Sequence, residues 1–388
     1  FHLVMQSEQP SPEVSSEVSR ARASVAVWRA VELGVLILDG PDAGTFLHNV
    51  LTADVKRIEI GSGKFAAACK PNGQAYALPR VFRTAANDYM LVERRVWISK
   101  LFQGIEGLHF SESFMSEEAS TRLSVLGVAG PNAASLLATL VEGGNPPAFA
   151  TMPAHANLEV TLAGQKVRVL RESPLGGVGF WLVVETSAAD TLKKTLLERG
   201  EKLGAFTPSH EAREIMRIEA GWVLAGVDLP ENGLASELGI DHEALSYDKG
   251  CYIGQEIIAR LQTKGEVPNR IMGASLAPTA PVPNVGDALN GPDGKPGAVV
   301  TSACYSPSLG RPIAIVRVQR GYQLAGARLT FSANGANHEA VISELPLFVP
   351  GQLAASRELY DRALVMFAQD RTRSEEHTSE LQSLTNLV

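Results

Sequence analysis

One thiol in the chain has polar neighbours at a spacing that would support chemistry. Cys251 lies between two glycines, with Lys249 two residues before it and Gln255 and Glu256 just after the second glycine. The run 255–261 has the composition and spacing of a helix, so Cys251 would lie on the loop that enters this helix. Free N–H groups and the helix dipole favour a thiolate there, and Lys249 would act in the same direction. The alternative is a small buried cysteine in a tight turn, because glycines permit sharp turns.

The composition describes an ordinary globular chain. Its 388 residues, 45% hydrophobic and 20% charged, suffice for two or three domains with sizeable cores. The net charge of −7 does not indicate a nucleic-acid surface. No apolar run approaches the roughly 18 residues that a membrane helix needs. We therefore expect neither nucleic acid nor a membrane among its partners.

The cysteines and histidines do not have the spacing of metal sites. Cys69, Cys251 and Cys304 lie far apart without a Cys-x-x-Cys pair, which argues against a disulfide framework, a zinc site or an iron–sulfur cluster held by this chain alone. The eight histidines form no His-Glu-x-x-His pattern. We predict no stably bound metal and a reducing compartment, which is the cytoplasm in a bacterium or the mitochondrial matrix in a eukaryote.

Both ends of the chain differ in texture from the rest. Residues 6–20 are rich in Ser, Glu and Pro, so a disordered tail is expected over 1–24. Residues 373–388 resemble the translation of a common sequencing-adapter oligonucleotide. We expect that segment to be an artefact, and it carries no functional argument.

Two stretches of the chain repeat one pattern roughly 90 residues apart. In each, an apolar strand is followed by a Gly-Pro turn, a helix, a Gly-Gln pair and a closing strand. The strands are 35–39 and 89–93 in the first copy, and 123–129 and 180–185 in the second. A duplicated α+β unit explains the pattern, and chance similarity of two α/β segments is the alternative.

The remainder of the chain predicts one helix and a different kind of domain. A helix capped by Thr207 or Ser209 would carry Arg213 and Arg217 one turn apart. The structural alternative is that both arginines are solvated or paired with Glu214. Short β-prone runs at 270–277, 297–304, 312–319 and 327–332 alternate with Pro and Gly turns, as in a small antiparallel barrel.

The predicted fold class is therefore α+β. Its parts are the tail over 1–24, a first α+β unit over 25–120 that 207–265 would complete, a second unit over 121–206, the helix and motif segment over 207–265, an antiparallel β-barrel over 266–348 and a C-terminal helix over 349–372.

Several of these segments together resemble a known family. The stretch from Arg217-Ile218-Glu219-Ala220-Gly221 to Lys249-Gly250-Cys251-Tyr252-Ile253-Gly254-Gln255-Glu256 is similar to the YgfZ family of folate-binding proteins. That family belongs to the superfamily of the glycine-cleavage T-protein, an aminomethyltransferase. The resemblance extends to 40–43, 51–55 and 306–314. The octet is specific to the YgfZ branch, whereas the Gly-Pro turns are shared across the superfamily.

The resemblance implies a fold and a function. The fold is a three-domain ring of two ferredoxin-like α+β units and a small β-barrel. Family members bind tetrahydrofolate in the central channel and support the assembly or repair of iron–sulfur clusters in client proteins, including radical enzymes that modify tRNA. Their mitochondrial relatives act with A-type cluster carriers. Iron–sulfur clients, cluster carriers and folate are therefore the implied partners.

This chain departs from the T-protein branch at two places. Where T-proteins carry an Asp-Asp pair, the matching positions are Ala77 and Leu78, and the Gly-Glu-Asp-Gly turn reads Gly176-Gly177-Val178-Gly179. A carboxylate is the group expected to hold the pterin or move a proton there. The loss of both sites argues against one-carbon transfer by the T-protein mechanism.

The leading hypothesis is a tetrahydrofolate-binding accessory protein for iron–sulfur cluster assembly or repair. Cys251 would be the reactive thiol, Lys249 would lower its pKa, and a partner would supply the remaining cluster ligands. Arg217 would bind the glutamate tail of the folate. Tyr252 would stack on the ligand or belong to the core.

In the leading hypothesis, Gln255 and Glu256 would contact the ligand, or they would fix the loop structurally.

Two rival hypotheses remain. One rival is a folate-dependent aminomethyltransferase whose acid would be Glu219, Asp228 or Glu256. The other rival is a non-catalytic folate- or client-binding scaffold with a structural Cys251.

Overall fold

The computed structural model describes residues 9–143, 145–239, 244–264 and 267–350. The chain divides into two compact units, Phe1–Phe348 and Val349–Val388, and the helices and strands of the described residues belong to the first unit. The predicted helix over 349–372, apart from its first two residues, and the adapter-like segment lie outside the described residues.

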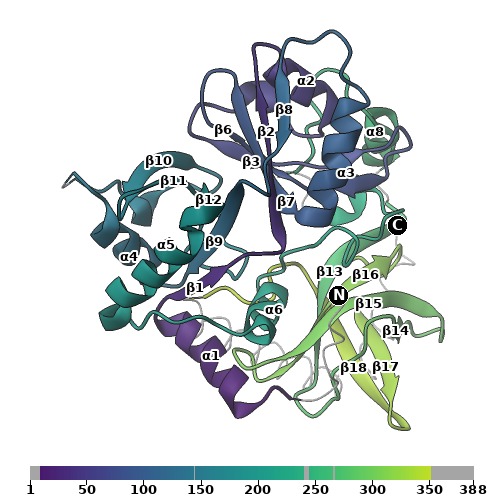
Figure 1. Ribbon diagram of the computed structural model, residues 1–388. Coiled ribbons are helices and arrows are strands. Elements are labelled where there is room, and N and C mark those ends of the chain that lie inside the picture. Colours follow the sequence, from purple (N-terminus) through teal and green to yellow (C-terminus); the bar gives the residue numbers. More distant parts are fainter. Residues whose placement is uncertain (1–8, 144, 240–243, 265–266, 351–388) are drawn as a thin grey trace, which may run out of the picture. The chain divides into compact units, whose positions relative to one another are not determined.

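The first α+β unit is a five-stranded antiparallel sheet with two helices (Figure 1). Its spatial order is β3-β6-β7-β2-β8. The strands are β2 (Leu33–Asp39), β3 (Gly63–Phe65), β6 (Arg80–Arg83), β7 (Asp88–Arg94) and β8 (Met115–Glu118), and the helices are α2 (Ala43–Val50) and α3 (Arg95–Glu106). A small hairpin, β4 (Ala68–Cys69) with β5 (Ala75–Ala77), lies between β3 and β6 in the chain. Leu36 and Leu91 of the central strands and Ile98 of α3 are fully buried in its core.

The second sheet repeats this topology. Its order β10-β11-β12-β9-β1 matches the first sheet strand for strand. The elements are β1 (Ala26–Arg29), β9 (Leu123–Ala129), β10 (Asn157–Leu162), β11 (Gln165–Leu170), β12 (Gly179–Glu185), α4 (Ala133–Leu140) and α5 (Thr186–Arg199). The predicted duplication and both sets of strands are confirmed. Gly40 and Gly130 take equivalent positions before the first helix of each copy. Both have positive φ, and a Cβ at either would lie 2.4 Å from backbone atoms.

The boundary between the two α+β units differs from the predicted one at residue 25. Strand β1 precedes the first sheet in sequence but pairs with β9 of the second sheet, with Ala26 opposite Ala129. The first sheet is completed by β8 instead, which pairs with β2. A four-residue strand carries no signal of which partner it will choose, so sequence order is a poor guide here.

The expected disordered tail is wrong for residues 12–23, which form helix α1 (Pro12–Ala23). Ser11 caps the helix, since its hydroxyl accepts from the backbone N–H of Val14 at 3.2 Å. Val14, Val18 and Ala21 are buried at helical spacing and pack toward α6 (His210–Glu219). These few apolar residues at a period of three to four outweigh the polar composition of the segment.

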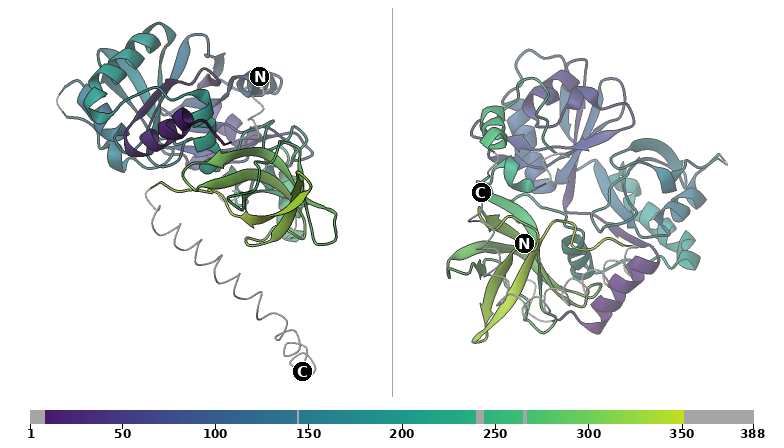
Figure 2. Two further views of the ribbon diagram at one scale, coloured as in Figure 1. Left: turned by 90° about the horizontal axis from the view of Figure 1, so that it is seen from below. Right: turned by 180° about the vertical axis from the view of Figure 1, so that it is seen from behind.

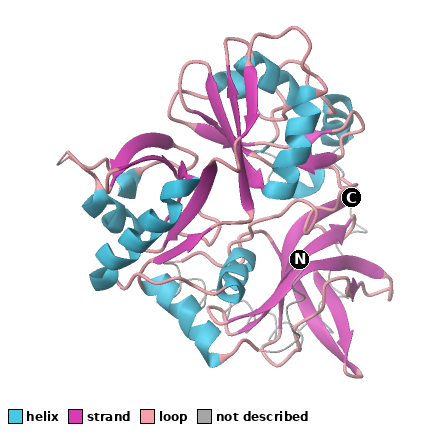
Figure 3. Cartoon of the chain, in the orientation of Figure 1, coloured by secondary structure: helices cyan, strands magenta, loops and turns pink. Residues whose placement is uncertain are grey.

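The predicted C-terminal barrel is confirmed as a closed six-stranded antiparallel barrel in the order β13-β16-β15-β14-β17-β18. Figure 2 shows its strands, coloured green to yellow, from two further directions, and Figure 3 shows that this part consists of strands and loops. The strands are β13 (Asn269–Leu276), β14 (Ala288–Asn290), β15 (Pro296–Ser306), β16 (Arg311–Gln319), β17 (Arg328–Ala333) and β18 (Ala336–Ser343). Strand β15 has a bulge between Val300 and Ser302.

Two helices carry the sequence motifs. Helix α6 begins after Ser209, whose hydroxyl accepts from the N–H of Ala212 at 3.2 Å, as one of the two predicted caps. Helix α8 (Gln255–Lys264) begins within the octet 249–256. In the described ranges, helices are too short or too polar to cross a membrane.

Candidate functional site

A cavity of about 440 Å³ lies beside α6. Its wall is built from β1, β12, the inner face of α6, the loop 222–227 and the bulge of β15. The volume falls within the roughly 300–1,000 Å³ of sites that hold one small organic ligand. Segments far apart in the sequence therefore meet at one concave site.

Three tryptophans form the aromatic part of the wall. Trp28 on β1 and Trp181 on β12 both pair with Gly127 of β9. Trp28, Gly127 and Trp181 therefore form one row across adjacent strands. A Cβ at Gly127 would lie 2.1 Å from the Trp28 ring, which shows that this indole covers the glycine. Trp222 meets Trp181 edge to face at 5.8 Å, and the Arg80 guanidinium lies 3.8 Å from the Trp222 ring centre. The three indole rings offer a flat surface for a heterocyclic ligand.

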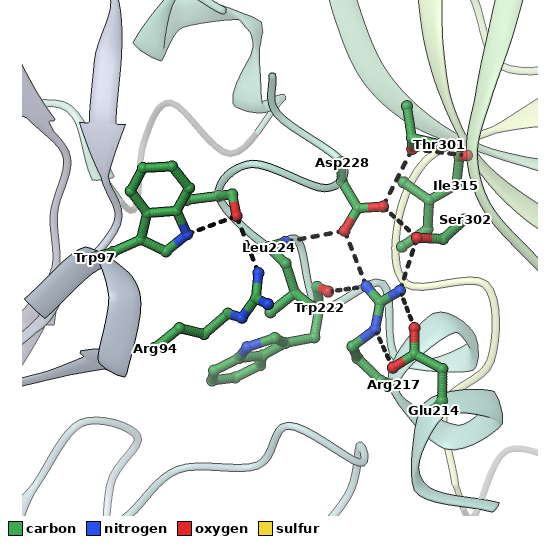
Figure 4. A network of polar contacts seen from close by, with 11 residues as sticks. Arg94, Trp97, Glu214, Arg217, Trp222, Leu224, Asp228, Thr301, Ser302 and Ile315 are labelled. Carbon is green, nitrogen blue, oxygen red and sulfur yellow. Dashed lines mark hydrogen bonds and ion pairs between the residues drawn. The ribbon is translucent and has the colours of Figure 1, made fainter. Parts of the chain in front are cut away.

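Arg217, predicted to bind the folate tail, is instead the centre of a buried polar network (Figure 4). All five of its N–H groups are used: two by Glu214, and one each by Trp222 O, Asp228 and the Ser302 hydroxyl, at 2.6–2.9 Å. Burial lowers the pKa of Arg217, but Asp228 and Glu214 raise it more, so the pKa lies above its ordinary value. A guanidinium with no remaining donor cannot bind a ligand carboxylate, so we correct the predicted role of Arg217 to a structural one.

Asp228 connects this network to the barrel. Its carboxylate accepts from Arg217 and from the N–H of Leu224 at 2.9 Å each, and from Ser302 at 2.6 Å. The Thr301 hydroxyl lies 3.1 Å from the same carboxylate. The bulge in β15 brings both hydroxyls toward one acceptor, as bulges near sites often do.

The loop that Asp228 anchors is also fixed on its other side. Ala225 O accepts from Trp97 Nε1 at 2.8 Å and from Arg94 at 3.2 Å (Figure 4). Barrel, α6 and the first sheet therefore hold the loop 222–228 against the cavity by hydrogen bonds.

The carboxylates proposed as alternative acids are occupied. Asp228 and Glu219 are fully buried. Glu219 accepts from Arg22 at 2.6 Å, from Ser306 at 2.5 Å and from Ser308 at 3.0 Å. Glu256 is exposed and pairs with Arg260 at 3.0 Å. None of the three is placed to exchange a proton with a ligand in the cavity.

Arg213 differs from Arg217 although it lies one turn earlier on the same helix. Within the described residues its guanidinium makes no hydrogen bond, and its Nε is buried without an acceptor. The closest carboxylate, that of Glu32, is 3.9 Å away. Burial lowers the pKa of Arg213. Arg213 lines the cavity together with Arg94, whose guanidinium donates to Ala225 O.

Lys249 makes structural contacts with the first α+β unit. Its ammonium donates to His48 O at 2.5 Å, to Ala53 O at 2.8 Å and to Leu51 O. It thus binds the carbonyl end of α2, where a cation is favourable. Burial lowers the pKa of Lys249 to about 8. These contacts bind Lys249 to the first α+β unit, and its predicted effect on the Cys251 thiol stays a prediction.

The other octet residues hold the loop. Tyr252 is buried with its ring centre 4.5 Å from the Lys249 ammonium. The Gln255 amide donates to Lys249 O at 3.4 Å. Cys251 is exposed, on the loop that leads into α8 as predicted, whereas Cys69 and Cys304 are buried. The structure brings Lys249, Tyr252 and Gln255 together, but none of the octet residues is part of the wall of the cavity beside α6.

Sequence reasoning missed the tryptophans and the use of Arg213. A signal existed, because the chain has four tryptophans, and three line the cavity while Trp97 anchors its loop. Only the strand register, which joins Trp28 to residues about 100 positions later, reveals their proximity. In the described ranges, His, Cys, Asp and Glu side chains form no group of three that could hold a metal ion.

Comparisons with known proteins cover almost the whole described chain. Residues 5–245 match the GCVT N-terminal domain, and residues 269–348 match the glycine cleavage T-protein C-terminal barrel domain. The aminomethyltransferase of Shouchella clausii (strain KSM-K16) is 25% identical over 336 residues, covering 86% of this chain and 89% of that protein. That of Corynebacterium jeikeium (strain K411) is 24% identical over 344 residues, covering 84% and 88%.

A solved structure has the same fold. The glycine cleavage system aminomethyltransferase T from Bartonella henselae superposes with a TM-score of 0.77 over 88% of this chain and 91% of that one, at 21% sequence identity. The similarity includes both the duplicated sheets and the barrel, since it spans nearly the full length of each chain.

Proposed function

The chain belongs to the glycine cleavage T-protein family, and from that premise we propose that it binds a reduced folate in the cavity beside α6 and uses it in one-carbon transfer. The observation that carries the proposal is the cavity wall itself, in which three tryptophans surround the site and Arg213 faces it. A folate has a flat pteridine, an aromatic linker and a carboxylate tail. Aromatic faces and a guanidinium are the groups that suit these parts.

The reaction class comes from the relatives named aminomethyltransferase. An S-aminomethyl donor would pass its methylene carbon to N5 and N10 of tetrahydrofolate, releasing ammonia and the free thiol. For this chain we assign no proton-transfer residue within the cavity. The departures at Ala77 and Leu78 are why the transfer itself must be measured rather than assumed.

Binding is tested by tryptophan fluorescence with 5-formyltetrahydrofolate as the probe. We expect saturable quenching, because three of the four tryptophans line the cavity. Trp222→Ala should weaken binding by about tenfold, since it removes one aromatic face, while Trp222→Phe keeps a ring and should bind nearly as well. Absence of any saturable change with the wild-type protein would refute the folate site.

A second function is favoured by one specific observation, the exposure of Cys251 away from the cavity wall. An accessory factor for iron–sulfur assembly, like the YgfZ family, would present this thiol to a client protein or cluster carrier. One thiol cannot hold a cluster alone, so the partner must supply the other ligands.

The two functions separate in one pair of assays. Conversion of tetrahydrofolate to its methylene form by the purified protein with an S-aminomethyl donor supports transfer. Rescue of an iron–sulfur-dependent tRNA-modifying enzyme in a bacterial strain lacking its own family member, by wild type but not by Cys251→Ser, supports the accessory role. Equal rescue by both proteins would leave Cys251 without a part in it.

A further inference from the structure

We infer that Arg80 is a positioning residue of the cavity: it fixes the Trp222 indole from outside the cavity wall and thereby sets the affinity for a stacked heterocyclic ring. This role rests on the proposed folate site, because Trp222 lines that cavity whereas Arg80 does not. Arg80 would act on the ligand through another side chain rather than by touching it.

The Arg80 guanidinium lies between two aromatic rings. Its central carbon is 3.8 Å from the centre of the Trp222 ring and 3.9 Å from the centre of the Phe65 ring. At such distances a ring must lie over a face of the planar guanidinium, and one face has no room for both rings. Arg80 therefore separates Phe65 of β3 from Trp222 and covers one face of the indole. A ligand ring cannot stack on that face.

A buried carboxylate holds Arg80 in this place. Glu172 is buried, and its oxygens have different neighbours. Its Oε2 lies 3.8 Å from Nε of Arg80, and its Oε1 lies 2.6 Å from Nδ1 of His155. A buried ion pair resists displacement, because moving either group leaves the other charge without a partner away from water. Glu172 thus keeps the guanidinium where it contacts the indole.

The indole needs such a contact, because the hydrogen bond of its residue fixes only the backbone. Arg217 donates to Trp222 O at 2.7 Å, which leaves the side-chain torsions of Trp222 open. Two neighbours restrict them: Arg80, over one face, and Trp181, whose ring meets the indole edge to face at 5.8 Å. Arg80 comes from β6 of the first sheet and Glu172 follows β11 of the second, so both α+β units take part in placing this ring.

The test is a double-mutant cycle on ligand affinity, measured by calorimetric titration with 5-formyltetrahydrofolate. Arg80→Met fills the space between the rings without a charge, and we expect it to weaken binding at least about fivefold. In the Trp222→Ala background the same change should have no further effect, because the side chain through which Arg80 acts is gone. Arg80→Lys keeps the cation but not the flat fork, so its affinity should lie between those of the wild type and Arg80→Met.

A matched control comes from the same strand. Arg83→Met removes an arginine whose ring partner, Tyr89, lies outside the cavity wall, and it should bind as the wild type does. If Arg80→Met does not fold, Arg80→Lys in the two backgrounds carries the test. Unchanged affinity of the folded Arg80 variants, or equal weakening with and without Trp222, overturns the inference and leaves the folate site standing. Failure of the wild type to bind overturns both.

Discussion

At the scale of single residues, burial decides which ionisable groups have a structural role. Glu93 on β7 is buried, and its carboxylate accepts from the N–H of Leu78 at 3.0 Å and of Arg94 at 2.7 Å. Leu78 is one of the two positions at which the T-protein acidic pair is absent. The first α+β unit therefore does hold a carboxylate beside this position, contributed by β7.

Glu93 should make stability depend on pH. Burial raises the pKa of Glu93 from 4.5 to about 7 in the folded protein. The folded state then binds more protons than the unfolded state between these values, so this contribution is present below pH 4.5 and is lost as the pH rises through 7. Thermal unfolding of wild type and Glu93→Gln at pH 5 and pH 7.5 checks this. The wild type should lose stability relative to the variant at the higher pH, and a difference independent of pH would contradict the assignment.

Lys249 should matter for stability in its own right. Lys249→Met leaves three backbone carbonyls at the end of α2 without their donor, so we expect a loss of about 2 kcal/mol in the free energy of unfolding. Urea denaturation measures this. Lys56→Met, at an exposed position just after α2, is the matched control and should change stability little.

At the scale of elements, the cavity depends on the register of three strands. Trp28 and Trp181 reach one site because β1 and β12 both pair with β9 at Gly127. The missing side chain at Gly127 gives the Trp28 indole its place. A larger residue there would push the indole and change the aromatic wall.

Gly127→Ala should therefore cost about 2 kcal/mol in stability and weaken ligand binding, because the added Cβ would lie 2.1 Å from the Trp28 ring. Urea denaturation and the fluorescence titration measure the two effects. Gly250→Ala is the comparison, since a Cβ at Gly250 meets no heavy atom within 4 Å and the residue has no positive φ. If both variants were equally stable, the packing argument for Gly127 would be wrong.

At the scale of the whole molecule, the residues that precede the first sheet are part of the folded structure. Helix α1 is joined to the central segment by Glu17, which accepts from the backbone N–H of Ser209 at 2.8 Å, and by the ion pair of Arg22 with Glu219 at 2.6 Å. Removal of residues 1–24 should lower the free energy of unfolding by about 3 kcal/mol or more, because Val14 and Val18 lose their burial. Removal of residues 1–8 is the control, with both chains compared by urea denaturation.

Sequence reasoning succeeded where the signal was local or repeated, and failed where it depended on a distant partner. The strands around 35–39 and 123–129, the cap at Ser209 and the barrel strands follow from short patterns that the fold preserves. The pairing of Arg217 with Glu214, given as the structural alternative, is confirmed. Its contacts with Asp228 and Ser302 could not be predicted, because these residues lie on other elements. The octet predicted the loop that exposes Cys251, but the acceptors of Lys249 lie about 200 residues earlier in the chain.

The pairing of β1 with the second sheet affects how the chain must be made. A ribosome releases β1 long before β9, its partner, which follows about 100 residues later. Until β9 is made, β1 has no strand to pair with, whereas the strands of the first sheet, β8 included, all precede β9 in the chain. Contacts so distant in sequence slow folding. The two copies of the duplicated unit therefore cannot be separated by one cut, because any gene split between them leaves the second copy without its edge strand.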